Sequence, residues 1–390
     1  MPGPFWLLRL AAAFAAAVGL AAVLAATGWR AEHFRDGDFI QYWLAGRALL
    51  TGADMYDPTV WRGLHDAIGS AGSEVAPGLG FLYPLPVALY ALPFALLPLS
   101  LAGPLWLVAQ GMTALIALIA LGRRLFTRAP RRDLALLLEL AVVMEPVFVI
   151  GNDGNITRFM IGIVGGGLAL LLSGRPFTAG LLLGLAGVKP QLVLAFVPLL
   201  VLFCPRVLRL RLVAGGLVTI VASALVTTAF RPAWIGEWVS QALGARGEYG
   251  RLNVWGLVPA GSAWLAWLIV SGALVAIIWW WRAFGPDLAR SASAALGFSV
   301  FVAPYAADYD LAVLLVGVPA VLATIATFPS MWRAAFIAVL IVTSPALVLL
   351  AALGLVDQAA LFIPPVALVA LVIGTQLLGR RVGSPNADRT

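Results

Sequence analysis

The sequence carries few charged residues and almost no cysteine, histidine or lysine. Only 11% of its 390 residues are charged, whereas an average soluble domain has about 25%. The single cysteine, Cys204, excludes an internal disulfide and indicates no thiol or zinc chemistry. Two histidines, His33 and His65, are too few for a metal site built from histidine. Lysine occurs once, at Lys189, and every other basic residue is an arginine.

Motifs for nucleotide binding are also missing. The chain has no Walker or dinucleotide-binding glycine fingerprint. The net charge of +7 does not indicate nucleic acid as a partner, because the basic residues are scattered in short clusters between hydrophobic segments. Short basic clusters between apolar segments are typical of an inner membrane protein, in which they set the topology of the spans.

Long apolar runs, in a chain that is 62% hydrophobic, predict an all-α polytopic membrane protein with one membrane-embedded domain over 1–390. Residues 1–28 contain the first span, at about 8–28, which is long enough to cross ~30 Å of hydrocarbon. Residues 29–100 form an extracytoplasmic loop with juxtamembrane helices, and 101–390 hold the remaining spans. These are expected near 101–122, 133–150, 156–173, 177–188, 190–204, 211–230, 253–281, 291–305, 309–327, 333–352 and 359–378. The total is about twelve, with both ends cytoplasmic.

The apolar stretch 81–99 has two interpretations. If it spans the membrane, the arginine cluster at 123–132 lies on the same side as the long loop; if it does not, the cluster lies on the cytoplasmic side. The excess of arginine favours the second alternative, and so do the prolines within the stretch. We therefore expect a re-entrant or surface helix. The short segments on either side of Lys189-Pro190 are expected to be broken or tilted.

The richest polar stretch is 36–58, directly after the first span. It places Phe39, Tyr42, Trp43, Gly46, Leu49 and Leu50 on one helical face, which predicts an amphipathic helix at the membrane surface. Asp38 begins this helix. It has two interpretations, an N-cap that only accepts the free amides or a catalytic base at the membrane boundary.

Further polar groups recur at the outer ends of predicted spans. They are Gly151–Asn155 with Arg158, Lys189 with Gln191, and Pro304–Asp310. The loop from Arg231 to Asn253 lies on the same side. Because ionisable groups at membrane depth usually mark function, these groups predict a shared polar cavity. For Lys189 two interpretations stay open, snorkelling to the interface or contact with a phosphate.

The pattern Gly37-Asp38-Phe39, Tyr42-Trp43, Gly46-Arg47 and then Asp54-x-Tyr56-Asp57-Pro58 resembles the opening of a known family. That family is the bacterial polyprenyl-phosphate-mannose-dependent mannosyltransferases of the GT-C superfamily. The resemblance implies a GT-C-like helical bundle. It also implies transfer of a sugar, commonly mannose, from a polyprenyl-phosphate donor to a hydroxyl of a glycolipid or glycan, with inversion. Asp38 is then the expected general base, facing the extracytoplasmic side of the cell membrane.

The resemblance extends to other positions. The Gly184-Leu-x-x-x-Lys189-Pro190 segment is similar to a family element, which implies that Lys189 contacts the donor phosphate. Arg158, one turn into its span, is a second candidate for the phosphate. Asn155 matches a Gly-Gln-x-Asn turn. Asp308 and Asp310 stand where many relatives have histidines, so the resemblance implies that an aspartate replaces histidine in sugar binding. Asp36, Tyr42 and Arg47 complete the candidate substrate contacts.

Alternatives from other classes are a transporter or flippase, because broken spans with charges also fit transport, and a scaffold without catalysis. No metal or cofactor is expected, although a divalent metal held by Asp36 and Asp38 is kept as an alternative. The expected partners are the lipid-linked donor, the acceptor and the bilayer, without nucleic acid.

Overall fold

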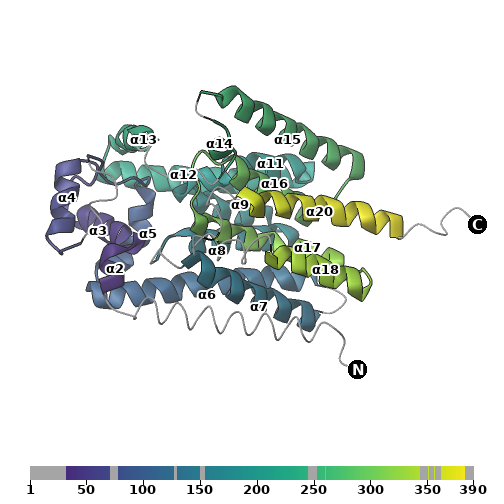
Figure 1. Cartoon of the computed structure of the whole chain (residues 1–390). Helices are drawn as coiled ribbons and strands as arrows, with labels where there is room; N and C mark the ends of the chain where they lie inside the picture. Colours follow the sequence, from purple (N-terminus) through teal and green to yellow (C-terminus); the bar gives the residue numbers. More distant parts are fainter. Residues whose placement is uncertain are drawn as a thin grey trace, which may run out of the picture.

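The computed structural model describes residues 32–70, 78–126, 130–149, 154–244, 253–259, 261–342, 350, 355 and 362–382. Within these ranges all regular structure is helical, and no strand occurs. Figure 1 shows the long helices lying side by side, with the short helices of the first loop gathered at one end. The expected first span at 8–28 lies outside the described residues.

Among the residues that the structure describes, three helices are long and apolar enough to cross a membrane. They are α6 (Leu99–Leu125), α12 (Arg206–Phe230) and α15 (Ala263–Phe284). The first two confirm the spans expected at 101–122 and 211–230. The third covers most of 253–281, which also contains the short α14 (Val254–Leu257). The chain is therefore a multi-pass membrane protein, while the total of about twelve spans stays a prediction.

The other helices of the bundle are shorter or less uniformly apolar. They are α7 (Pro130–Val149), α8 (Thr157–Leu172), α9 (Pro176–Gly184), η2 (Leu185–Val188), α10 (Pro190–Val193), α11 (Phe196–Phe203), α16 (Leu288–Val302), η4 (Asp308–Val316), α17 (Val318–Ile325), α18 (Ser330–Ile341) and α20 (Ile363–Val382). The predicted break at Lys189-Pro190 is confirmed, because four short helices replace two continuous spans there. The break leaves Lys189 between η2 and α10 with a non-helical backbone.

The first loop forms α2 (Glu32–Asp36), α3 (Asp38–Thr51) and α4 (Pro58–Asp66), and these lie beside α13 (Trp234–Gly244) in Figure 1. Asp54 forms an ion pair with Arg231 at 2.5 Å. Gln241 of α13 donates to the Tyr56 carbonyl at 2.8 Å and accepts from the Gly80 amide at 3.0 Å. The two loops therefore lie on the same side of the protein, as the sequence predicted.

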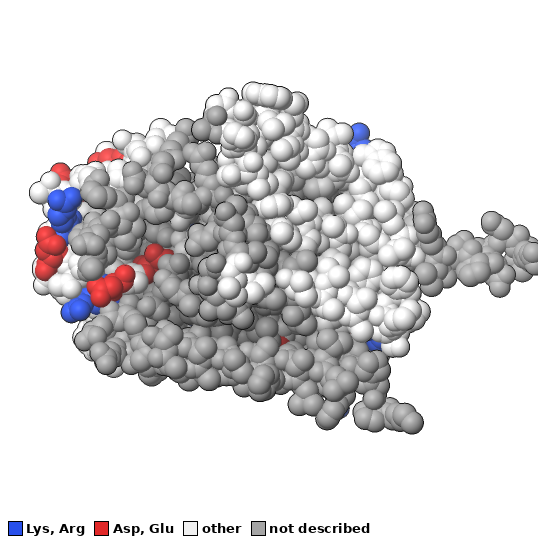
Figure 2. Space-filling view, viewed as in Figure 1, with Lys and Arg blue, Asp and Glu red and all other residues white. Residues whose placement is uncertain are grey.

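Charged side chains gather at this end of the molecule. Figure 2 shows acidic and basic groups over α2–α4 and α13, whereas the side formed by α15, α16 and α20 is almost free of charge. An apolar surface of this kind suits contact with lipid, and the charged end suits contact with water.

The stretch 81–99 contains α5 (Pro86–Ala95), which has ten residues. At 1.5 Å per residue it is about 15 Å long, about half the hydrocarbon thickness. The chain then turns at 96–98 before α6 begins at Leu99. The segment is therefore not a clean span, in agreement with the favoured interpretation.

The prediction of a surface helix at 39–50 is wrong for α3. Its residues from Phe39 to Gly46 are all buried, so the helix has no solvent-facing side over its first half. The reason is close packing by α5, where a Cβ atom on Gly46 would lie 2.7 Å from the Ala95 Cβ. α3 is an internal helix that carries Asp38 at its first turn.

Candidate active site

The site is built on the turn that precedes α8. Gly154 has φ +87°, and a Cβ atom there would lie 2.7 Å from the Phe39 Cβ, so the position requires glycine. The Gly154 carbonyl accepts from the Trp106 indole at 2.7 Å, and the Asn155 carbonyl accepts from Gln110 at 2.9 Å. These bonds fix the backbone of the turn, and with it the position of the Asn155 side chain.

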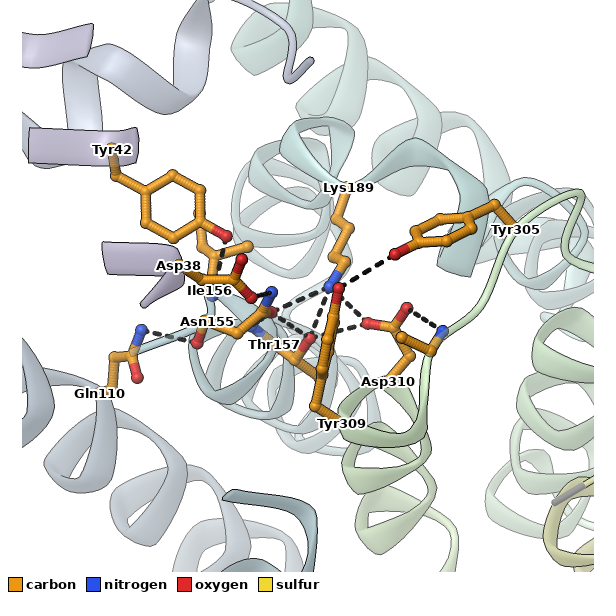
Figure 3. A network of polar contacts seen from close by, with 11 residues as sticks. Asp38, Tyr42, Gln110, Asn155, Ile156, Thr157, Lys189, Tyr305, Tyr309 and Asp310 are labelled. Atoms are coloured by element: carbon orange, nitrogen blue, oxygen red, sulfur yellow. Dashed lines mark hydrogen bonds and ion pairs between the residues drawn. The ribbon is translucent and has the colours of Figure 1, made fainter. Parts of the chain in front are cut away.

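The Asn155 amide bridges two charged regions of the site. Its Nδ2 donates to Asp38 Oδ2 at 2.7 Å, while its Oδ1 accepts from the Thr157 amide at 2.9 Å and from Lys189 Nζ at 2.9 Å. Because donors surround Oδ1, the amide can present only its NH₂ group to Asp38. The orientation of Asn155, and therefore the hydrogen bond to the carboxylate, depends on the cation behind it (Figure 3).

Lys189 enters the site from the break between η2 and α10. Its side chain is 0% exposed, and its ammonium forms an ion pair with Asp310. It also donates to Thr157 Oγ1 at 2.7 Å and lies 4.6 Å from the centre of the Tyr309 ring. The snorkelling interpretation is therefore wrong. A lysine buried this deeply is tolerated because it is paired and hydrogen-bonded.

Asp310 is the acidic partner, and it is also 0% exposed. Its Oδ1 accepts from Thr157 Oγ1 at 2.9 Å, and its Oδ2 accepts from the Ala307 amide at 3.1 Å at the start of η4. Beside it the hydroxyls of Tyr305 and Tyr309 lie 3.1 Å apart. Each carboxylate oxygen of Asp310 therefore has partners of its own, which holds η4 against α8.

Asp38 lies at the open end of this network. It is half-buried in the first turn of α3, and the N-cap is Gly37, with no capping bond from a side chain. The N-cap interpretation of Asp38 is therefore wrong. Burial, with a smaller contribution from the Asp38 charge, raises the pKa of Tyr42 well above its usual range. Burial likewise raises the pKa of Tyr83, so both hydroxyls near the carboxylate are neutral at ordinary pH.

The structure brings together five of the residues singled out by sequence. Asp38, Asn155, Lys189 and Asp310 form one chain of contacts (Figure 3), and the Tyr42 hydroxyl accepts from the Ile156 amide at 3.4 Å beside them.

Three further candidates lie on α2, α3 and α8. Asp36 is exposed at the end of α2, 3.9 Å from the Arg35 guanidinium. Arg47 is exposed and lies over the Trp43 ring at 4.8 Å. Arg158 is half-buried and directly follows Thr157 in α8, so the two side chains leave the helix on different faces. Asp308 is the first residue of η4, and its side chain is not among those that the structure describes.

Sequence reasoning missed Thr157 and Gln110 as members of the site, whereas Tyr309 belongs to the predicted polar group Pro304–Asp310. Thr157 contacts Asn155, Lys189 and Asp310, and so connects three elements. The available signal was a threonine two residues after Asn155, at the start of an apolar helix. For the metal alternative, the described residues contain no group of three histidine, cysteine, aspartate or glutamate side chains suited to an ion.

A buried polar network between broken helices is typical of the functional site of a membrane protein. The comparison with known families names its class: the chain belongs to glycosyltransferase family 87, whose model matches residues 81–304. It is a membrane glycosyltransferase, which decides against the transporter and scaffold alternatives. The match includes Asn155, Arg158 and Lys189 but ends before Asp310 and begins after Asp38. No curated protein and no solved structure matches the chain.

Proposed function

We propose that this glycosyltransferase moves a sugar, expected to be mannose, from a polyprenyl-phosphate donor to a hydroxyl of a glycolipid or glycan. The reaction takes place on the extracytoplasmic side of the bacterial cell membrane. The observation that carries the proposal is the half-buried Asp38 carboxylate, held by Asn155 at the edge of a buried polar network. Asp38 is the first residue of α3, and α3 belongs to the charged end of the molecule (Figures 1 and 2).

In the proposed reaction Asp38 acts as the general base. The acceptor oxygen attacks the anomeric carbon, the bond from that carbon to the phosphate oxygen breaks, and the proton of the hydroxyl passes to Asp38. The polyprenyl phosphate leaves with its negative charge, and a single displacement inverts the anomeric centre. The Asn155 NH₂ group supports this role because a donor to a carboxylate oxygen favours the ionised form that a general base needs.

The donor phosphate needs cationic partners, because stabilising the leaving group lowers the barrier. Arg158 is the proposed direct contact. For Lys189 the resemblance implies the same role, but its ammonium is enclosed by Asp310, Asn155 and Thr157. A phosphate reaches it only if one of these contacts opens. We therefore propose that Lys189 acts on the reaction through Asn155, as a positioning residue.

The proposed sugar contacts lie near the Asp38 carboxylate. Tyr42, which follows Asp38 by one helical turn in α3, is one of them. Asp310 is proposed to hold Lys189, since both its oxygens are already engaged. Asp308 and Arg47 stay proposed substrate contacts, and Asp36 is a weaker one because it is exposed beside Arg35.

Matched variants of the two loop aspartates test this proposal. Asp38→Asn should lower transfer by at least ~100-fold, the lower end of what a general base contributes, with normal assembly in the membrane. Asp36→Asn should retain most of the activity. The measurement is radiolabel transfer from a panel of polyprenyl-phosphate sugars into membrane lipids. Activity in Asp38→Asn together with loss in Asp36→Asn would show that the base is misassigned.

A further inference from the structure

An apolar groove of about 990 Å³ runs along α8. α8 packs against both α6 and α9 and forms its floor. Gly162 and Gly166 lie on that floor and have no side chains to fill it. The walls are the second half of α6 and the Leu182–Leu185 region of α9 and η2. A groove of this size is in the range that holds a small ligand, and its apolar lining suits a hydrocarbon chain.

One end of the groove is cationic. Arg123 and Arg124 in the last turn of α6, and Arg175 directly before α9, all line it and are all exposed. In the ranges that the structure covers, none of the three forms an ion pair with a carboxylate. Three uncompensated guanidinium groups around one groove form a site for an anion, because guanidinium groups bind phosphate with paired hydrogen bonds.

The other end of the groove approaches the candidate active site. Ile156 lines it there together with Tyr90 and Phe159, and Ile156 directly follows Asn155. α8 separates the two ends and has 16 residues, so it is about 24 Å long. A phosphate held by the arginines therefore lies too far from Asp38 for a sugar on that phosphate to react there.

We propose that the arginine end of this groove binds an anionic glycerophospholipid that is not a substrate. Its phosphate lies on Arg123, Arg124 and Arg175, and one acyl chain runs over Ala120 and Ala169 toward the middle of α8. An acyl chain covers one leaflet, about half of ~30 Å, which matches the arginine half of the groove. The lipid fastens α6 to α9 across α8, which begins at Thr157 and follows the turn that holds Asn155 in the site.

The test uses the purified full-length protein in detergent, stripped of lipid and then supplied with dioleoyl phosphatidylglycerol. Dioleoyl phosphatidylcholine is the comparison lipid. Binding is measured by native mass spectrometry and by the shift in thermal unfolding temperature. The triple variant R123Q/R124Q/R175Q is compared with R206Q/R211Q/R282Q, which removes the same charge from exposed arginines outside the groove.

We expect the unaltered protein and the control triple variant to retain phosphatidylglycerol, at least 10-fold more than phosphatidylcholine. The groove triple variant should lose this preference. A second variant, Ala120→Phe, keeps the arginines but fills the groove, and should also weaken lipid binding.

Equal retention of phosphatidylglycerol by the two triple variants would overturn the proposal. Stoichiometric displacement of the lipid by polyprenyl phosphate would overturn it as well, because the groove would then belong to the donor. Both measurements are made without substrates, so their outcome is independent of the proposed sugar transfer.

Discussion

Asn155 is the residue on which the geometry of the site depends. The Nδ2 atom of its side-chain amide donates hydrogen bonds and the Oδ1 atom accepts them, and Lys189 and Thr157 both donate to Oδ1. Only the NH₂ group remains for Asp38. A neutral amide thus links the position of the buried Lys189 cation to the Asp38 carboxylate.

Replacing Asn155 with aspartate should change the pH dependence of the enzyme. The variant places a carboxylate where the amide donated to Asp38, and like charges raise the pKa of the pair by about one unit or more. Because a general base works only when ionised, the acidic limb of the pH–rate profile should move to higher pH. Transfer rates between pH 4 and 9 measure this shift. Asp36→Asn serves as the control and should leave the limb in place. An unmoved limb in Asn155→Asp would contradict the role of the amide.

Lys189 can be tested against the alternative of direct phosphate contact. Lys189→Met leaves Asp310 buried and unpaired, which typically costs about 3–5 kcal/mol, so the single variant should unfold at lower temperature. The double variant Lys189→Met/Asp310→Asn should recover most of that stability but not the activity. If Lys189 positions Asn155, kcat falls while the donor KM changes less than about twofold. A large rise in donor KM with unchanged kcat would instead indicate phosphate contact.

Sequence reasoning singled out members of the contact network where a residue was chemically isolated. Lys189 is the lone lysine in an apolar region, and Asp38 begins the helix in the richest polar stretch, so both were apparent. The pairing of Lys189 with Asp310 was not predictable, because it depends on breaks in two helices far apart in the chain. Thr157 was missed for a related reason: a threonine near a helix start is ordinary until its three partners are known.

At the scale of elements, the turn before α8 is the most constrained part of the site. Gly154→Ala should destabilise the protein by ~1–2 kcal/mol through its left-handed backbone, and further through contact with Phe39. Gly174→Ala is the matched control, since Gly174 has φ +74° but no neighbour within 4 Å. Thermal unfolding should show a larger loss for Gly154→Ala, with reduced transfer activity. Equal losses would mean that the contact with Phe39 is unimportant.

The sequence predicted the existence of most helices but not the burial of α3. A single apolar face at 39–50 matches a surface helix, yet Gly46 on that face has no side chain and so allows α5 to approach closely. A hydrophobic pattern predicts that one face of a helix is buried. It does not predict which other helix packs there, because that depends on the tertiary structure. The short α5 was better predicted, because its prolines limit the length of a helix directly.

At the scale of the whole molecule, the ion pair between Asp54 and Arg231 places two loops on one side, and the arginine-rich turns belong on the other. This arrangement predicts that Arg62, exposed on α4, is extracytoplasmic and that Arg206, exposed at the start of α12, is cytoplasmic. In a Cys204→Ala background, Arg62→Cys should react with an impermeant maleimide on intact cells. Arg206→Cys should react only after permeabilisation. The reverse pattern would invert the topology.

The distance in sequence between the two buried charges has a consequence for how the protein is made. Lys189 leaves the ribosome about 120 residues before Asp310 does. At ~5–20 residues per second this is a delay of roughly 6–24 s. During that interval the lysine has no carboxylate from η4, and an unpaired cation in hydrocarbon is costly. The nascent chain must therefore keep this region at the water boundary or shield it by the insertion machinery. The site is completed only when the last third of the chain has been delivered to the membrane.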